Sequence, residues 1–164
     1  MGPMQEVQTV NTELDEFDKQ IIRALQGNGR LTNVELADMA NLSPSACHRR
    51  LKSLLEADYF DKFTGIVNPA HFGYTGTAIV SMRLDAQQED LFQQFEDAVR
   101  LVPQVKACYL MTGEFDYQLT VIYKDTQHFE ELYYKTLLRL PGVNTTKTQM
   151  VLRKVHNTQE VPIT

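Results

Sequence analysis

The chain has 164 residues, of which 43% are hydrophobic, and a formal net charge of −5 at pH 7. This length suffices to bury a core in one large or two small domains, and the negative charge excludes a nonspecific polycation without excluding a local DNA-binding patch. The sequence carries neither an apolar run long enough to span a membrane nor a signal peptide, so we expect a cytoplasmic protein with no membrane partner. Residues 1–13 are expected to be a disordered lead-in, whose Met1-Gly2-Pro3 ahead of Met4 is typical of a cloning remnant.

The segment 14–60 is predicted to form three short amphipathic helices. Asp15 is placed to cap the first helix, and two glycines end it. Thr32 and Glu35 have the spacing of a capping box, in which the hydroxyl and the carboxylate each accept a hydrogen bond from an otherwise unpaired backbone N–H. The second helix therefore begins at about Thr32.

The third predicted helix has two chemically different faces. Ser43 is a good N-cap, and Pro44 fits the first turn because its missing N–H costs nothing there. Cys47, Leu51 and Leu54 recur at helical spacing and are expected to face the other helices. The residues left on the outer face are mainly polar or basic: Ser45, Ala46, His48, Arg49, Lys52 and Ser53.

Such a helix, following a capping box and a tight turn, is typical of a helix–turn–helix domain, whose second helix lies in the DNA major groove. A solvated basic face on an ordinary helical bundle is the alternative. The local charge is modest, since Arg49, Arg50 and Lys52 are opposed by Glu56. Because the number of phosphate contacts sets affinity through counterion release, we expect several copies of the module to bind one DNA.

The second half of the chain changes to the alternating pattern of strands. Residues 61–76 are assigned to a small wing and a linker strand, with a two-stranded wing predicted between Tyr59 and Val67. Residues 77–164 are predicted to form a ferredoxin-like βαββαβ domain, which makes the whole chain an α+β protein with both C-terminal helices on one face of an antiparallel sheet. The expected elements are a strand at 78–84, a helix at 91–102, strands at 105–111 and 117–123, a helix at 129–140 and a strand at 145–155.

Both faces of this sheet carry apolar residues. The alternation places Ile79, Leu110 and Ile122 on one face, and Val80, Tyr109 and Val121 on the other. Two helices can cover only one of these faces, so a second subunit is the simplest cover for the other.

No catalytic or metal-binding residues are predicted. Cys47 and Cys108 are distant in sequence and expected to be small buried hydrophobes, and the histidines lack the spacing of metal ligands. An enzyme is the rival from another class, because ferredoxin-like domains host many chemistries, but no catalytic motif is present. Two binding functions compete as well: a protein that wraps DNA with little sequence preference, and a metabolite sensor whose N-terminal helices bind protein.

Read together, these segments resemble the Lrp/AsnC (feast/famine) transcription regulators. The resemblance covers Leu14 to Ile163 and rests on LDEFDKQIIRALQGNGRLTNVELADMANLSPSACHRRLKSLLE, followed by CYLMTGEFDYQL and TLLRLPGVNTTKTQMVL. It implies a winged helix–turn–helix domain, a C-terminal domain that dimerises through its sheet, further assembly to tetramers or octamers, and a small amino acid bound between dimers. The function implied is that of a sequence-specific, nucleoid-associated regulator that uses no cofactor and whose partners are double-stranded DNA and a free amino acid.

The resemblance also assigns residues. Its recognition helix falls on Ser43 to Glu56, in which Arg50 serves either a DNA phosphate or an intramolecular ion pair. The DNA contacts expected are Ser43, Ser45, His48, Arg49, Arg50 and Lys52. The effector contacts expected are Gly113, Glu114, Phe115 and Asp116 in one loop and Thr148, Gln149 and Met150 in an opposing segment.

The chemistry of the expected effector site suits a free amino acid. Asp116 would pair the ammonium group, while backbone N–H groups around Gly113 would approach the carboxylate. Leucine, methionine or another small amino acid fits this description; the alternative is that the loop is only a hairpin turn. Two departures from the family pattern stand out, because Ala57-Asp58 replaces a helix-closing glycine and Gln149 replaces a frequent aromatic residue.

Overall fold

The computed structural model of the protein describes residues 14–85 and 89–164, and the expected lead-in at 1–13 lies outside this range. The chain divides into two compact units. One unit consists of residues 67–155, and the other consists of residues 14–66 together with His156–Thr164. The assignment of 156–164 to the N-terminal unit differs from the sequence-based expectation, which placed these residues with the C-terminal domain.

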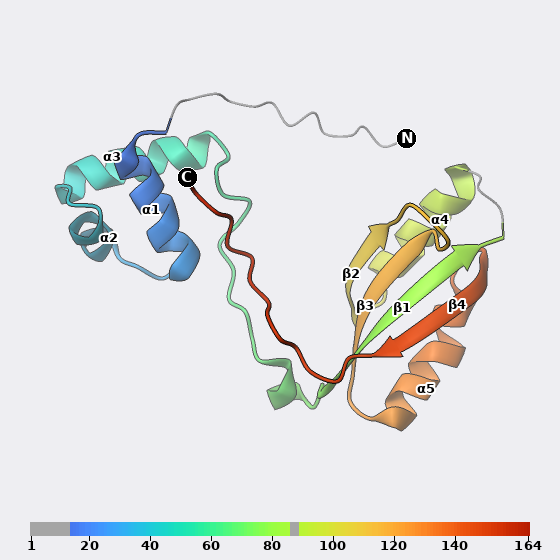
Figure 1. Ribbon diagram of the computed structural model, residues 1–164. Helices are drawn as coiled ribbons and strands as arrows, with labels where there is room; N and C mark the ends of the chain where they lie inside the picture. Colours follow the sequence, from blue (N-terminus) through green and yellow to red (C-terminus); the bar gives the residue numbers. More distant parts are fainter. Residues whose placement is uncertain (1–13, 86–88) are drawn as a thin grey trace. The chain divides into compact units, whose positions relative to one another are not determined.

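The N-terminal unit begins with the predicted helices. They are α1 (Glu16–Gly27), α2 (Asn33–Met39) and α3 (Pro44–Glu56) (Figure 1). Each predicted N-cap is confirmed, since the side chains of Asp15, Thr32 and Ser43 each accept a hydrogen bond from the backbone three residues later. The capping box is complete because Glu35 accepts the backbone N–H of Thr32 at 2.7 Å, which lowers the pKa of Glu35.

The three helices pack around a core that matches the predicted pattern at most positions. Ile21, Leu36 and Cys47 are fully or almost fully buried, and Leu54 is 3% exposed. Phe17 and Val34 are apolar residues of α1 and α2 that stay outside this core and are exposed. The ring of Phe17 instead lies under the guanidinium group of Arg50, 5.4 Å from it.

The turns that end α2 and α3 have the same backbone conformation and the same hydrogen-bond pattern. Asn41 and Asp58 both have positive φ, +53° and +55°, directly after the helix cap. The next N–H in each case bonds back to the third residue from the helix end, at 2.9 Å for Leu42 and 3.1 Å for Tyr59. This is the Schellman arrangement, whose left-handed position usually holds glycine and is occupied here by Asn41 and Asp58.

The expected two-stranded wing is not formed. Among the described residues, 59–68 contain no strand, and Ile66 and Val67 are exposed. Within the described part of the chain, residues 60–68 belong to no strand pair. The aromatic and β-branched residues that suggested strands therefore serve elsewhere, and Tyr59 and Phe60 pack against the core of the three helices.

The C-terminal unit has the predicted βαββαβ order. Its elements are β1 (Gly76–Leu84), α4 (Glu89–Arg100), β2 (Val105–Leu110), β3 (Tyr117–Tyr123), α5 (Thr126–Lys135) and β4 (Val143–Met150), with 3₁₀ turns η1 (Pro69–Phe72) and η2 (Leu137–Arg139). The sheet is antiparallel, in the order β2-β3-β1-β4. Helices α4 and α5 lie on the same face of it (Figure 1), and Phe95 and Phe129 from these helices share one buried core with Val80 and Leu119 of the sheet.

Two details of the sheet differ from the prediction. The last strand ends at Met150 rather than at Val155, and only one further bond, from the N–H of Val151 to the carbonyl of Thr77 at 2.9 Å, continues its pairing with β1. On β2, a register shift between Val105 and Ala107 reverses the expected phase. Leu110 therefore shares the helix-covered face with Tyr117, and Tyr109 lies on the open face.

The open face of the sheet remains partly apolar. Ile79 and Ile122 are half-buried there, and Tyr109 is 56% exposed. This face carries the apolar residues that the sequence analysis expected a second subunit to cover.

Replacing Asp58 by Gly is expected to stabilise the N-terminal unit by about 0.5–1 kcal/mol, because a left-handed residue without Cβ avoids the strain that a side chain meets there. Thermal unfolding measures the change. Asp61→Gly is the matched control, since Asp61 is also exposed but has no positive φ, and it should be neutral or destabilising. Equal effects of the two substitutions would contradict the role assigned to Asp58.

Candidate DNA-binding and effector sites

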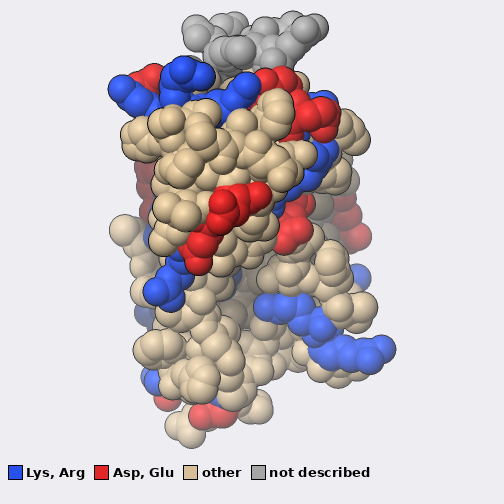
Figure 2. Space-filling view, turned by 90° about the vertical axis from the view of Figure 1, so that its left-hand side faces the viewer, with Lys and Arg blue, Asp and Glu red and all other residues tan. Residues whose placement is uncertain are grey.

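The outer face of α3 presents the side chains predicted to contact DNA. Ser45, His48, Arg49 and Lys52 are all exposed, while Cys47 on the opposite face has no exposed surface. Lys52 makes an ion pair with Glu56 at 3.6 Å, in which both side chains are about two-thirds exposed. In the view of Figure 2, Lys and Arg lie among Asp and Glu, so positive charge on this face of the molecule is discontinuous.

The start of α3 is fixed by hydrogen bonds. The Ser43 hydroxyl caps the helix at the N–H of Ala46 and lies 3.3 Å from the Ser45 hydroxyl. The side-chain amide of Asn33, at the start of α2, donates to the carbonyl of Pro44 at 2.8 Å. Ser43 is thus engaged in holding the helix, and the first turn of α3 is tied to α2.

Arg50 forms the intramolecular ion pair that the sequence analysis left as one of two alternatives. Its Nη1 lies 2.8 Å from a carboxylate oxygen of Asp15 and 2.9 Å from one of Asp18. Its side chain is 28% exposed, against 18% for Asp18. These contacts raise the pKa of Arg50, chiefly through the hydrogen bond to Asp18, and they tie α3 to the start of α1.

The loop predicted to bind an effector is held by its own chain. The Asp116 carboxylate accepts the backbone N–H of Leu84 at 2.8 Å, and the N–H of Asp116 donates to the carbonyl of Met82. Gly113 has φ +117° with open space around its missing Cβ, so a side chain there would be strained although nothing would block it.

Arg83, on β1, contacts this loop and was not predicted from the sequence. Its Nε donates to the carbonyl of Glu114 at 2.9 Å, and its Nη2 lies 3.4 Å from the Glu114 carboxylate. Its guanidinium group also lies over the ring of Phe115. No local motif marks Arg83, and only the antiparallel arrangement of β1 and β3 brings it to the loop.

Within one chain, the second predicted effector segment lies away from this loop. Tyr117, the residue after Asp116, is opposite Met82 on one side of β1, whereas Thr148 and Met150 are opposite Val80 and Ala78 on the other side. Strand spacing then separates the segments by about 10 Å across the sheet and by about 7–13 Å along it. The two segments of one chain therefore cannot contact the same small amino acid.

The three residues of that segment also face different ways. Thr148 and Met150 lie on the helix-covered side, whereas Gln149, opposite Ile79, lies on the open side. The Thr148 hydroxyl is buried and has no hydrogen-bond partner within the described residues. Met150 accepts a hydrogen bond from the Tyr123 hydroxyl through its sulfur at 3.4 Å.

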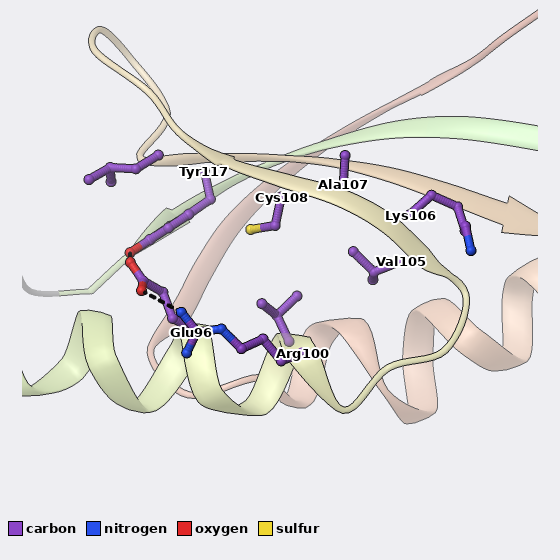
Figure 3. Close-up of a pocket in the computed structure, with 9 residues that line it drawn as sticks. Glu96, Arg100, Val105, Lys106, Ala107, Cys108 and Tyr117 are labelled. Carbon is purple, nitrogen blue, oxygen red and sulfur yellow. Dashed lines mark hydrogen bonds and ion pairs between the residues drawn. The ribbon is translucent and has the colours of Figure 1, made fainter. Parts of the chain in front are cut away.

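A cavity of about 380 Å³ lies between α4 and β2 (Figure 3). Inside it the buried Tyr117 donates its hydroxyl proton to Glu96 at 2.9 Å, and Arg100 pairs with Glu96 at 3.3 Å. Burial raises the pKa of the Cys108 thiol to about 11, so the thiol is protonated at neutral pH and is a poor nucleophile. Burial together with the bond to Glu96 also raises the pKa of Tyr117. Tyr117, Glu96 and Arg100 thus satisfy one another in this cavity.

Further structural facts bear on other kinds of site. Within residues 14–85 and 89–164, no three His, Cys, Asp or Glu side chains gather in a way that could hold a metal ion. No helix of the described part has both the length and the apolar character needed to cross a membrane.

Comparison with known proteins gives two family-model matches. Residues 14–60 match a winged helix–turn–helix DNA-binding model, and residues 77–161 match the Lrp/AsnC ligand-binding domain. The leucine-responsive regulatory proteins of Klebsiella pneumoniae and Escherichia coli are each 34% identical over 151 residues, which is 92% of this chain and 92% of each relative.

Solved structures show the same architecture along most of the chain. A transcriptional regulator of Neisseria meningitidis in complex with L-methionine is 35% identical, with a TM-score of 0.86 over 91% of this chain and 96% of that one. An AsnC-family regulator of Agrobacterium tumefaciens, at 24% identity, shares the fold with a TM-score of 0.85 over 91% of this chain and 97% of its own.

Arg50→Ala is expected to destabilise the N-terminal unit by about 1–2 kcal/mol, because it leaves two carboxylates without their shared partner. In a double-mutant cycle with Asp18→Ala, the coupling energy should be about 0.5–1.5 kcal/mol by denaturant unfolding. Arg49→Ala removes the same charge from the exposed face and should change stability by less than about 0.5 kcal/mol. If Arg50→Ala kept full stability and only weakened DNA binding, the phosphate role would be the correct one.

Proposed function

Because this chain belongs to the Lrp/AsnC family of DNA-binding transcriptional regulators, we propose that it reads DNA with α3 and responds to a free amino acid bound between dimers. The observation that carries this proposal is the outward face of α3, whose polar side chains stay free of the core while the helix itself is fixed by caps and by Arg50.

On DNA, the N-terminal half of α3 is proposed to read base edges. Ser45, His48 and Arg49 lie there on the exposed side, and Lys52, one turn later, is placed for a phosphate. Ser43 and Arg50 are proposed to position the helix, since both are engaged within the chain. With so few positive charges in each copy, tight binding requires two or more copies on one DNA.

The dimer is proposed to form through the open face of the sheet. Ile79, Ile122 and Tyr109 give this face apolar area that the helices leave uncovered. Tetramers or octamers of such dimers would bring the loop of one chain toward the β4 segment of another. This arrangement supplies what one chain lacks, because its own two effector segments lie on opposite sides of β1.

The effector is proposed to be an amino acid with an apolar side chain. Asp116 is half-buried and carries the charge that an ammonium group needs, and the open backbone at Gly113 leaves room for a carboxylate. Phe115, with Met150 of a neighbouring chain, would line the apolar part. Leucine and methionine, which appear in the names of the relatives, are the first compounds to test.

A regulator of this kind acts where the DNA is, so we place it in the cytoplasm, on the nucleoid. The competing candidate is an architectural protein of the same fold that wraps DNA with little sequence preference. Competition by random DNA at fixed salt separates the two, since a specific regulator keeps a large ratio of specific to nonspecific affinity.

Arg49→Ala is expected to weaken operator binding by about 1–3 kcal/mol, unevenly across operator variants, if Arg49 contacts a base. Gel-shift titration of the folded variant measures this. Lys52→Ala should instead weaken all sequences alike and reduce the salt dependence. An Arg49→Ala variant that binds every operator as the parent protein does would remove Arg49 from the reading surface.

The effector site is tested with Asp116→Asn, which removes the charge but keeps an oxygen for the N–H of Leu84. Operator affinity is measured with and without saturating L-leucine or L-methionine. We expect the variant to lose the amino-acid effect, typically 5–150-fold in affinity, while its ligand-free DNA binding stays largely intact. Asp90→Asn, an equal change of charge on exposed α4, should keep the response. A full response in Asp116→Asn would mean that the loop is only a turn.

A further inference from the structure

The side chain of Gln26, near the end of α1, pairs with the backbone of the C-terminal tail, residues 156–164. Its Nε2 donates to the carbonyl of Val161 at 3.1 Å, and its Oε1 accepts the N–H of Val161 at 2.6 Å. A primary amide presents a donor and an acceptor side by side, as one strand does to the next. Gln26 therefore holds Val161 through its backbone alone.

A second contact lies one turn earlier on the same helix. Arg23 donates to the carbonyl of Ile163 through Nε at 3.3 Å and through Nη2 at 2.9 Å. The side chain of Ile163 is half-buried and packs against the core of the three helices. Pro162 stands between the two anchored residues, and an extended chain presents alternate backbone groups to one side, so its missing N–H costs no contact to α1.

The tail is also shaped before it reaches α1. The hydroxyl of Thr158 accepts the backbone N–H of Glu160 at 3.0 Å, which turns the chain locally. The Lrp/AsnC ligand-binding model matches only as far as residue 161, so the anchor at Ile163 lies beyond the part that the family model describes.

We propose that α1 carries a peptide-binding surface whose ligand is the chain's own C-terminal tail, and that the docked tail completes the DNA-binding unit. The surface consists of Arg23, Gln26 and the apolar edge that receives Ile163. The partner it fits is an extended segment with the pattern Val-Pro-Ile, recognised through backbone groups and one apolar anchor. Only residues 151–155 separate this tail from β4. The segment proposed to contact the effector therefore leads directly into the tail that binds α1.

The test compares the full chain with a chain that ends at Gln159, using hydrogen exchange of the α1 amides. Loss of four hydrogen bonds and of the Ile163 contact should raise exchange near Arg23–Gln26 at least about tenfold. A synthetic peptide of residues 156–164 added in excess should restore protection. The same peptide carrying Ile163→Asp should not.

Two full-length variants decide the matter if the shortened chain fails to fold. Gln26→Ala and Arg23→Ala should each raise exchange in α1, whereas Arg30→Ala, which removes the same charge from an exposed turn of the same unit, should leave it unchanged. Unchanged α1 exchange in both Gln26→Ala and Arg23→Ala would overturn the proposal, as would equal rescue of the shortened chain by the two peptides.

Discussion

The C-terminal unit depends on the pairing of β1 along both of its edges. β3 and β4 both pair with β1, one along each edge. The loop that precedes β3 and the residues at the end of β4 are therefore kept on opposite sides of β1. The same pairing aligns Val80 and Met82 for complete burial under the helices and fixes Asp116 at the N–H of Leu84. A composite effector site built from these two segments is therefore incomplete in any single chain.

In the proposed function, that constraint would tie sensing to assembly. A ligand shifts an equilibrium only by the difference in its affinity for the two states. A site built from two chains has a higher affinity for its ligand in the assembled state, because all of its contacts are present only when the chains associate. The sparse positive charge of α3 works in the same direction, because DNA affinity then rests on how many copies are presented together and at what spacing.

Local chemistry made much of this molecule predictable from the sequence. Caps at Asp15, Thr32 and Ser43 depend on residues three positions apart, and the strand and helix order follows from periodicity. What failed depends on distant partners. Both faces of β2 are apolar, so the sequence alone does not say which residues face the helices; a bulge and the pairing with β3 decide it. A strand near Thr64 would have needed a pairing partner, and the described residues do not provide one.

The candidate sites also differ in how far they could be predicted from local sequence. The outward face of α3 follows from helical spacing, and family resemblance supplied the effector loop, but Arg83 at Glu114 and the tail on α1 join residues far apart in sequence with no motif to announce them. The tail has the larger consequence. A unit connected to the rest of the chain at Ile66 and again at His156 is tied at two points, and it has fewer accessible orientations than one held by a single linker. Under the proposal that the tail docks on α1, four hydrogen bonds and the Ile163 contact close this second connection, so the far end of the described sequence completes the core of the N-terminal unit.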